Sequence, residues 1–200
     1  MLKLFFYLVF FSIISIYSQT DDMLISEFSF KDKENENILP KKMIFTQRLV
    51  WGKKGLFRTS GISKLNSKNR QKEIKLRRKM LNFHQFVGYL TLAGMLAQGY
   101  IGGKLYNGDS SLYNLHKNMG KAVTISYFTG AGLSLFAPPP LVNKKVKGFS
   151  SIKAHKFLAS IHFSAMVATN LLADKNKKQH KIAAYTAFTS YAMAILVFKF

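Results

Sequence analysis

Residues 80–103, MLNFHQFVGYLTLAGMLAQGYIGG, form a run without a single charged side chain. Three similar runs follow, at 122–143, 157–173 and 182–198. Each is close to the roughly 20 apolar residues that an α-helix needs to cross about 30 Å of hydrocarbon. The pattern predicts an all-α integral membrane protein whose residues 82–200 form an up-and-down four-helix bundle.

The charge distribution supports the same interpretation. Thirty Lys and Arg against nine Asp and Glu give a net charge of +21, which favours an anionic partner. A nucleic-acid-binding protein would interleave basic residues with its helices, whereas here they gather at the ends of the uncharged runs. We therefore expect contact with membrane lipids, with basic anchors at the headgroups, and no binding of nucleic acid.

The chain has no cysteine. This excludes disulfides, thiolate zinc sites, iron–sulfur clusters and covalently attached c-type haem. Any metal must be held by His, Met or carboxylate side chains.

Two segments precede the predicted bundle. Residues 1–18, MLKLFFYLVFFSIISIYS, are typical of a cleaved signal peptide, with an uncleaved anchor helix as the alternative. Residues 19–81 form a polar, basic arm, in which apolar residues around Trp51 suit either an interfacial segment or a loop that packs over the bundle mouth. The signal predicts an exported arm and a bacterial inner-membrane location, although the positive-inside rule favours the opposite orientation.

Four histidines occupy equivalent places, each within about one turn of the start of an uncharged run: His84, His116, His155 and His180. A small residue follows each of them four positions later: Gly88, Gly120, Ala159 and Ala184. Residues i and i+4 lie on one face of a helix, so the small residue leaves a recess beside the imidazole that a porphyrin could enter. A lysine follows three of the histidines directly, where it could face a haem propionate: Lys117, Lys156 and Lys181.

Helix direction predicts how the histidines pair. Successive helices of an up-and-down bundle run in opposite directions, so His84 and His155 share one end, and His116 and His180 share the other. Each diagonal pair could provide the two axial ligands of one iron, and such a centre passes electrons without an open position for oxygen. The bland alternative is that these histidines are interfacial polar residues. The fifth, His162, has Met166 four residues later and is expected to be a hydrogen-bonded core residue.

The segments NLHKNMGKA, KAHKFLAS and QHKIAAY resemble the repeated histidine signatures of the cytochrome b561 family of membrane dihaem electron carriers. The resemblance covers about residues 80–200. It implies that His84 and His155 bind one haem, and that His116 and His180 bind the other. The chain departs from the family in having four predicted helices in place of six, and in lacking recognisable ascorbate-site motifs.

The expected function is transmembrane electron transfer by a bis-histidine cytochrome with two non-covalent b-type haems. Its partners would be a quinol or other reductant and a redox acceptor protein, and the chain could be a subunit of a membrane oxidoreductase or an oligomer. We expect no catalytic residue of its own, because the cofactor carries the redox chemistry. The alternatives are a cofactor-free assembly or scaffold subunit, and a metal or proton transporter that uses the same histidines.

Overall fold

The computed structural model describes residues 38–141 and 150–197. The predicted signal peptide, residues 1–18, and the first part of the arm, residues 19–37, lie outside the described residues.

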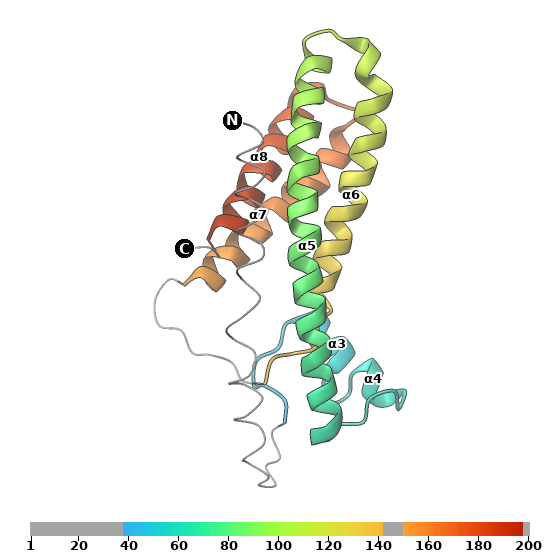
Figure 1. Ribbon diagram of the computed structural model, residues 1–200, viewed down its shortest axis with the longest axis vertical. Helices are drawn as coiled ribbons and strands as arrows, with labels where there is room; N and C mark the ends of the chain where they lie inside the picture. Colours follow the sequence, from blue (N-terminus) through green and yellow to red (C-terminus); the bar gives the residue numbers. More distant parts are fainter. Residues whose placement is uncertain (1–37, 142–149, 198–200) are drawn as a thin grey trace. The chain divides into compact units, whose positions relative to one another are not determined.

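Four long helices dominate the described chain (Figure 1): α5 Ser67–Tyr106, α6 Tyr113–Leu135, α7 Ser151–Leu172 and α8 Lys177–Leu196. Helices α5 and α6 form one antiparallel hairpin, and α7 and α8 form a second. Packing is closest within each hairpin, and α5 also meets α8. In the parts of the chain that the structure describes, every regular element is helical, which confirms the all-α prediction.

Polar caps explain where three of these helices begin. The side chains of Asn66, Ser150 and Asn176 each accept a hydrogen bond from the backbone amide three residues later. The turn after α5 depends on Gly108, whose φ of +108° lies in a region that side chains with a Cβ disfavour. A short 3-10 helix, Ser110–Leu112, then leads into α6.

The prediction of an integral membrane bundle is wrong. Over residues 38–141 and 150–197, no helix is both long and apolar enough to cross a membrane. The reason is that a run without charges is not necessarily hydrophobic, because hydroxyl, amide and imidazole groups also oppose transfer into hydrocarbon. The uncharged run in α6 illustrates this with its polar residues Thr124, Ser126, Tyr127, Thr129 and Ser134.

Helix α5 begins well before the uncharged run that predicted it. Residues 67–81, expected to be the end of a polar arm, form about its first four turns. One face of these turns carries Arg70, Glu73 and Arg77, spaced three and four residues apart, which is the spacing of helical neighbours. The predicted boundary between arm and bundle therefore falls inside a continuous helix.

The arm packs against the first turns of α5 and against the C-terminal end of α6. It contains two short helices, α3 Phe45–Trp51 and α4 Leu56–Thr59. Trp51 is 4% exposed and donates from its indole nitrogen to the carbonyl oxygen of Phe136, 2.9 Å away. Trp51 is thus a buried contact of the arm and not the headgroup anchor of an interfacial segment.

A buried ionic cluster holds the arm in place. Glu73 accepts hydrogen bonds from Arg58 and from Arg70, which is itself fully buried. Arg70 also donates to the carbonyl oxygen of Pro139 at 3.1 Å, and Arg77 donates to that of Pro138 at 2.7 Å. Burial raises the pKa of the Glu73 carboxyl, but the hydrogen bonds from Arg58, Ser63 and Arg70 outweigh it and hold the pKa below its ordinary value.

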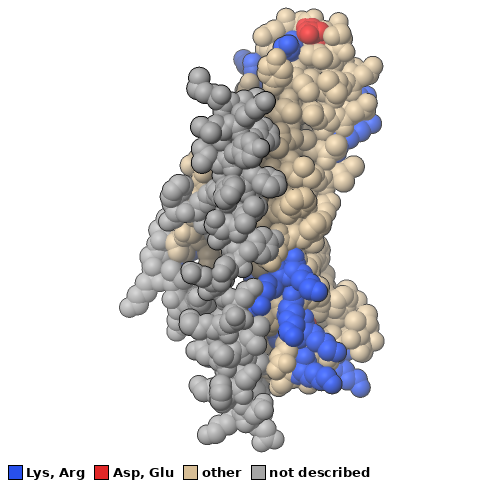
Figure 2. Space-filling view, in the orientation of Figure 1, with Lys and Arg blue, Asp and Glu red and all other residues tan. Residues whose placement is uncertain are grey.

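The remaining basic side chains of this region gather on the surface of the arm and of the first turns of α5 (Figure 2). Five exposed lysines illustrate the concentration: Lys64, Lys68, Lys72, Lys75 and Lys79. At the opposite end, the hairpin of α5 and α6 is longer than that of α7 and α8. There the Nζ atom of Lys181, near the start of α8, lies 4.0 Å from the centre of the Tyr106 ring at the end of α5. The two ends of the helical region are therefore covered by different elements.

Candidate functional site: two levels of paired histidines

The structure brings His116 and His180 together at the end where both hairpins turn. Their ring centroids are 6.2 Å apart and the ring planes meet at 82°. Burial lowers the pKa of His116, and the neighbouring His180 lowers it further. This is the pair that helix direction predicts for one end.

His84 and His155 lie at the other end, nearer to the arm. Burial lowers the pKa of His84, its hydrogen bond to Gly130 raises it, and His155 is close enough to lower it again. Both imidazoles are about as covered as those of the first pair, half-buried between helices. Each pair takes one histidine from each hairpin, and the ring contact is between His116 and His180.

Three of the four imidazoles are fixed by a backbone carbonyl of the neighbouring helix. The Nδ1 atom of His84 lies 2.8 Å from the carbonyl oxygen of Gly130, and that of His155 lies 3.0 Å from the oxygen of Ala194. The Nδ1 atom of His180 lies 2.8 Å from the oxygen of Thr169. A carbonyl can only accept, so Nδ1 carries the proton and donates, which leaves Nε2 of a neutral ring unprotonated and able to bind a metal.

These three contacts follow one rule of position. Gly130 comes fourteen residues after His116, Ala194 fourteen after His180, and Thr169 fourteen after His155. Each of these three imidazoles hydrogen-bonds to a carbonyl of the other helix of its own hairpin. That carbonyl lies fourteen residues after the histidine of that other helix. The two hairpins therefore share one arrangement around these histidines.

His116 is the exception. The rule predicts a bond to the carbonyl of Gln98, fourteen residues after His84. The Nδ1 atom of His116 instead is buried without a hydrogen-bond partner, and so is the side-chain oxygen of Gln98 beside it. A buried polar atom left unpaired costs about 1–3 kcal/mol, so two at one place indicate a site that lacks a component.

The arrangement fits axial ligation of an iron by two imidazoles. A metal bonded at about 2 Å by one nitrogen of each ring places the ring centroids about 6 Å apart, and the centroids of His116 and His180 are 6.2 Å apart. No group of three or more His, Asp or Glu side chains that could hold a metal occurs among residues 38–141 and 150–197. At this level the described residues bring two imidazoles together, those of His116 and His180.

The small residues expected to open recesses beside the histidines differ in their surroundings. A Cβ added to Gly88 would lie 3.6 Å from the hydroxyl of Tyr191, an ordinary contact. A Cβ added to Gly120 would lie only 2.9 Å from the side-chain nitrogen of Gln98. Ala159 and Ala184 are half-buried.

The three lysines expected near propionates lie on or near the surface. Lys156 and Lys117 are exposed, and the Nζ atom of Lys117 lies 5.6 Å from the ring of Tyr113. Lys181 is half-buried above Tyr106. Their role toward a haem stays a prediction.

A polar aromatic layer separates the two histidine levels. Thr91 lies seven residues after His84, halfway to Gln98, and His162 lies seven residues after His155, halfway to Thr169. Both are buried. His162 is 2.6 Å from the hydroxyl of Tyr127, and Tyr191 donates to the carbonyl of Gly88 at 3.2 Å. His162 thus has the hydrogen-bonded core position expected of it, between the two levels.

Repeat symmetry also relates the residues of this layer. Tyr127 and Tyr191 each lie eleven residues after the histidine of their helix, and their rings are 5.7 Å apart. Met95 and Met166 likewise correspond, and both belong to the buried core together with Val123 and Tyr127. The core of the molecule is therefore built from equivalent positions of the two hairpins.

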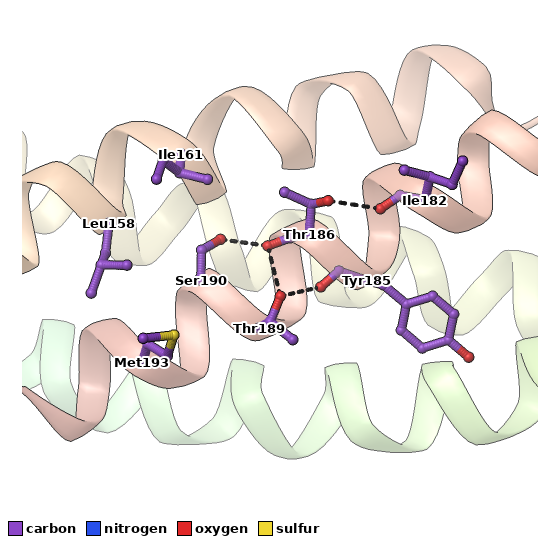
Figure 3. A pocket seen from close by; sticks show the side chains of 8 residues that line it. All are labelled: Leu158, Ile161, Ile182, Tyr185, Thr186, Thr189, Ser190 and Met193. Atoms are coloured by element: carbon purple, nitrogen blue, oxygen red, sulfur yellow. Dashed lines mark hydrogen bonds between the residues drawn. The ribbon is translucent and has the colours of Figure 1, made fainter.

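The open groove between α7 and α8 is not part of this site (Figure 3). It has a volume of about 480 Å³ and is lined largely by apolar side chains, among them Leu158, Ile161 and Met193. The hydroxyls of Thr186, Thr189 and Ser190 all donate to carbonyls of their own helix. No histidine lines the groove.

Comparisons of the chain with protein-family models, with curated proteins and with solved structures gave no match. The resemblance to the cytochrome b561 family therefore stays a prediction from the three histidine segments.

The sequence did not reveal the groups that orient the histidines, because these are backbone carbonyls and Gln98. One signal was present, however. Aligning the hairpins on His84 and His155, and on His116 and His180, superposes Phe86 with Phe157, Met95 with Met166 and Tyr127 with Tyr191. An internal repeat of this kind indicates equivalent positions in the two hairpins, but it does not show which backbone carbonyls the histidines contact.

Proposed function

We propose that the chain is a bis-histidine electron carrier that binds two b-type haems, one between His84 and His155 and one between His116 and His180. The observation that carries the proposal is the set of Nδ1 contacts to carbonyls at a constant offset. Orienting an imidazole through Nδ1 is how proteins present Nε2 to a metal. Histidines that served only as surface polar groups would have no need of a fixed tautomer.

The chain's own residues perform three tasks in this function. The four imidazoles would hold the iron ions of the two haems, while the carbonyls of Gly130, Ala194 and Thr169 fix the rings of His84, His155 and His180. The closely packed core of Met95, Val123, Tyr127 and Met166 lies between the levels. A bound haem supplies the one-electron redox chemistry.

The two levels are stacked along the helices. His84 and Gln98, which contact opposite levels, are fourteen residues apart on α5, or about 21 Å at the rise of an α-helix. The aromatic layer of Tyr127, Tyr191 and His162 occupies the space between. Electrons would pass along this axis from a quinol or another reductant to a redox acceptor protein.

A spectrum and a haem count test the proposal. The purified chain should show the sharp α-band of low-spin b-type haem on reduction, with two haems per polypeptide. His84→Ala and His155→Ala should remove the same haem, and His116→Ala and His180→Ala the other. His162→Gln, a change at the fifth histidine, is the matched control and should retain both.

Two outcomes would contradict the proposal. An absence of the α-band after reconstitution with hemin would exclude haem binding. Loss of the same haem in His84→Ala and His116→Ala would show that the pairing is wrong, even if haem were bound.

A further inference from the structure

The side chain of Gln98 occupies the space beside His116 that a haem would need. Its amide nitrogen donates to the carbonyl oxygen of His116 at 2.8 Å and lies 3.4 Å from Nε2 of the same ring. The same amide nitrogen lies 2.9 Å from the position that a Cβ on Gly120 would occupy. The recess that Gly120 opens is therefore filled by the Gln98 amide.

The second hairpin has no such obstruction. Thr169 is the counterpart of Gln98, and its hydroxyl donates to the carbonyl of Ala165 in its own helix, 2.7 Å away. The Thr169 backbone carbonyl accepts from Nδ1 of His180, 2.8 Å away. At Gln98 the equivalent bond is missing, and both His116 Nδ1 and Gln98 Oε1 are buried without partners.

We propose that Gln98 is a positioning residue that closes the His116/His180 site in the haem-free chain and makes the two haem sites unequal. When a haem enters, the Gln98 side chain leaves the recess over Gly120. His116 can then donate from Nδ1 to the backbone carbonyl of Gln98, as the other three histidines do to their carbonyls. The His84/His155 site fills first. This inference rests on the proposed function.

Hemin titration of single-site variants tests it. His84→Ala with His155→Ala leaves only the His116/His180 site, and adding Gln98→Thr installs the residue of the other hairpin. We expect hemin to bind about tenfold more tightly after this change, the effect of removing one competing hydrogen bond. Gln71→Thr, at an exposed glutamine of α5, is the matched control and should leave the affinity unchanged.

Two further measurements separate site closure from loss of folding. In the background His116→Ala with His180→Ala, Gln98→Thr should leave the hemin affinity of the His84/His155 site unchanged. In the hemin-free full chain, Gln98→Thr should shift the imidazole ¹⁵N resonances of His116 toward those of His180, because Nδ1 gains a carbonyl acceptor. Circular dichroism of each variant checks that the helices are formed.

The outcomes are distinguishable. Unchanged hemin affinity of the His116/His180 site in Gln98→Thr, with hemin bound by the wild-type chain, would overturn this inference alone. Equal filling of both sites in the wild-type chain would do the same. A wild-type chain that binds no hemin would overturn the proposed function as well.

Discussion

His162 is a buried base that hydrogen-bonds to a phenol, Tyr127, at 2.6 Å. Burial lowers its pKa to about 4, and the nearby His155 and His84 contribute to the same shift. In the unfolded chain the same imidazole should titrate near its ordinary value of about 6.5. Folding therefore requires this residue to stay neutral in a range where it would otherwise take up a proton.

The linkage predicts a loss of stability in mild acid. Between pH 6.5 and 4 the unfolded state binds the proton and the folded state does not, so the free energy of unfolding falls as the pH falls. From pH 7 to pH 5, His162 should account for about 2 kcal/mol of that loss. Urea unfolding of the wild type and of His162→Gln at both pH values measures it, because Gln does not titrate.

The contribution of the other histidines cancels in this comparison, since both proteins contain His84, His116, His155 and His180. If the wild type and His162→Gln lost equal stability between pH 7 and pH 5, His162 would not be the buried base described above.

At the scale of the elements, α5 and α6 approach closely because of glycines on their facing sides. A Cβ at Gly94 would lie 2.8 Å from Cγ2 of Val123, and a Cβ at Gly102 would lie 2.7 Å from Cε1 of His116. Around Gly99, by contrast, there is nothing within 4 Å. Glycine therefore permits the close approach of α5 and α6 at particular positions only.

This difference predicts opposite effects of the same substitution. Gly94→Ala should destabilise the chain by about 1–3 kcal/mol, because the buried, β-branched Val123 cannot turn away. Gly99→Ala should instead stabilise it by up to about 1 kcal/mol through helix propensity. Thermal unfolding of both variants measures the contrast, and a stabilising Gly94→Ala would contradict the close approach of α5 and α6.

The elements also show what the sequence could and could not predict. Helices over the uncharged runs and the shared ends of the histidine pairs follow from spacing and direction, which are properties of the chain itself. The first turns of α5 were missed because their charges were interpreted as a polar approach, although Arg70, Glu73 and Arg77 had helical spacing. The two arginines donate to backbone carbonyls, Arg70 to that of Pro139 and Arg77 to that of Pro138, which no side-chain pattern shows.

The membrane prediction failed for a related reason. It counted the absence of Lys, Arg, Asp and Glu as apolarity, whereas Thr91, Tyr127, His162 and Ser190 give the helices a polar interior layer. A scale of transfer free energies, applied to each window, would have separated the two properties.

At the scale of the whole molecule, repeat symmetry predicts equal costs at equivalent core positions. Met95 and Met166 are 8% and 5% exposed and belong to one core cluster. Met95→Ala and Met166→Ala should each lower the free energy of unfolding by about 2–5 kcal/mol. Met193→Ala, at a side chain 54% exposed, is the control and should change it by about 0.5 kcal/mol or less.

Chemical denaturation of the three variants measures these differences. A Met166→Ala variant as stable as Met193→Ala would show that the second hairpin does not share the core of the first.

The two ends of the helical region differ in shape and in charge, which affects what each end can bind. His116 follows His84 by 32 residues, whereas His180 follows His155 by only 25. The first hairpin is therefore longer than the second, and the ring of Tyr106 at the end of α5 contacts Lys181 of α8. The opposite end is closed by the arm, with its lysine-rich exterior. A partner whose surface matches one end of the helical region would match neither the shape nor the charge of the other end.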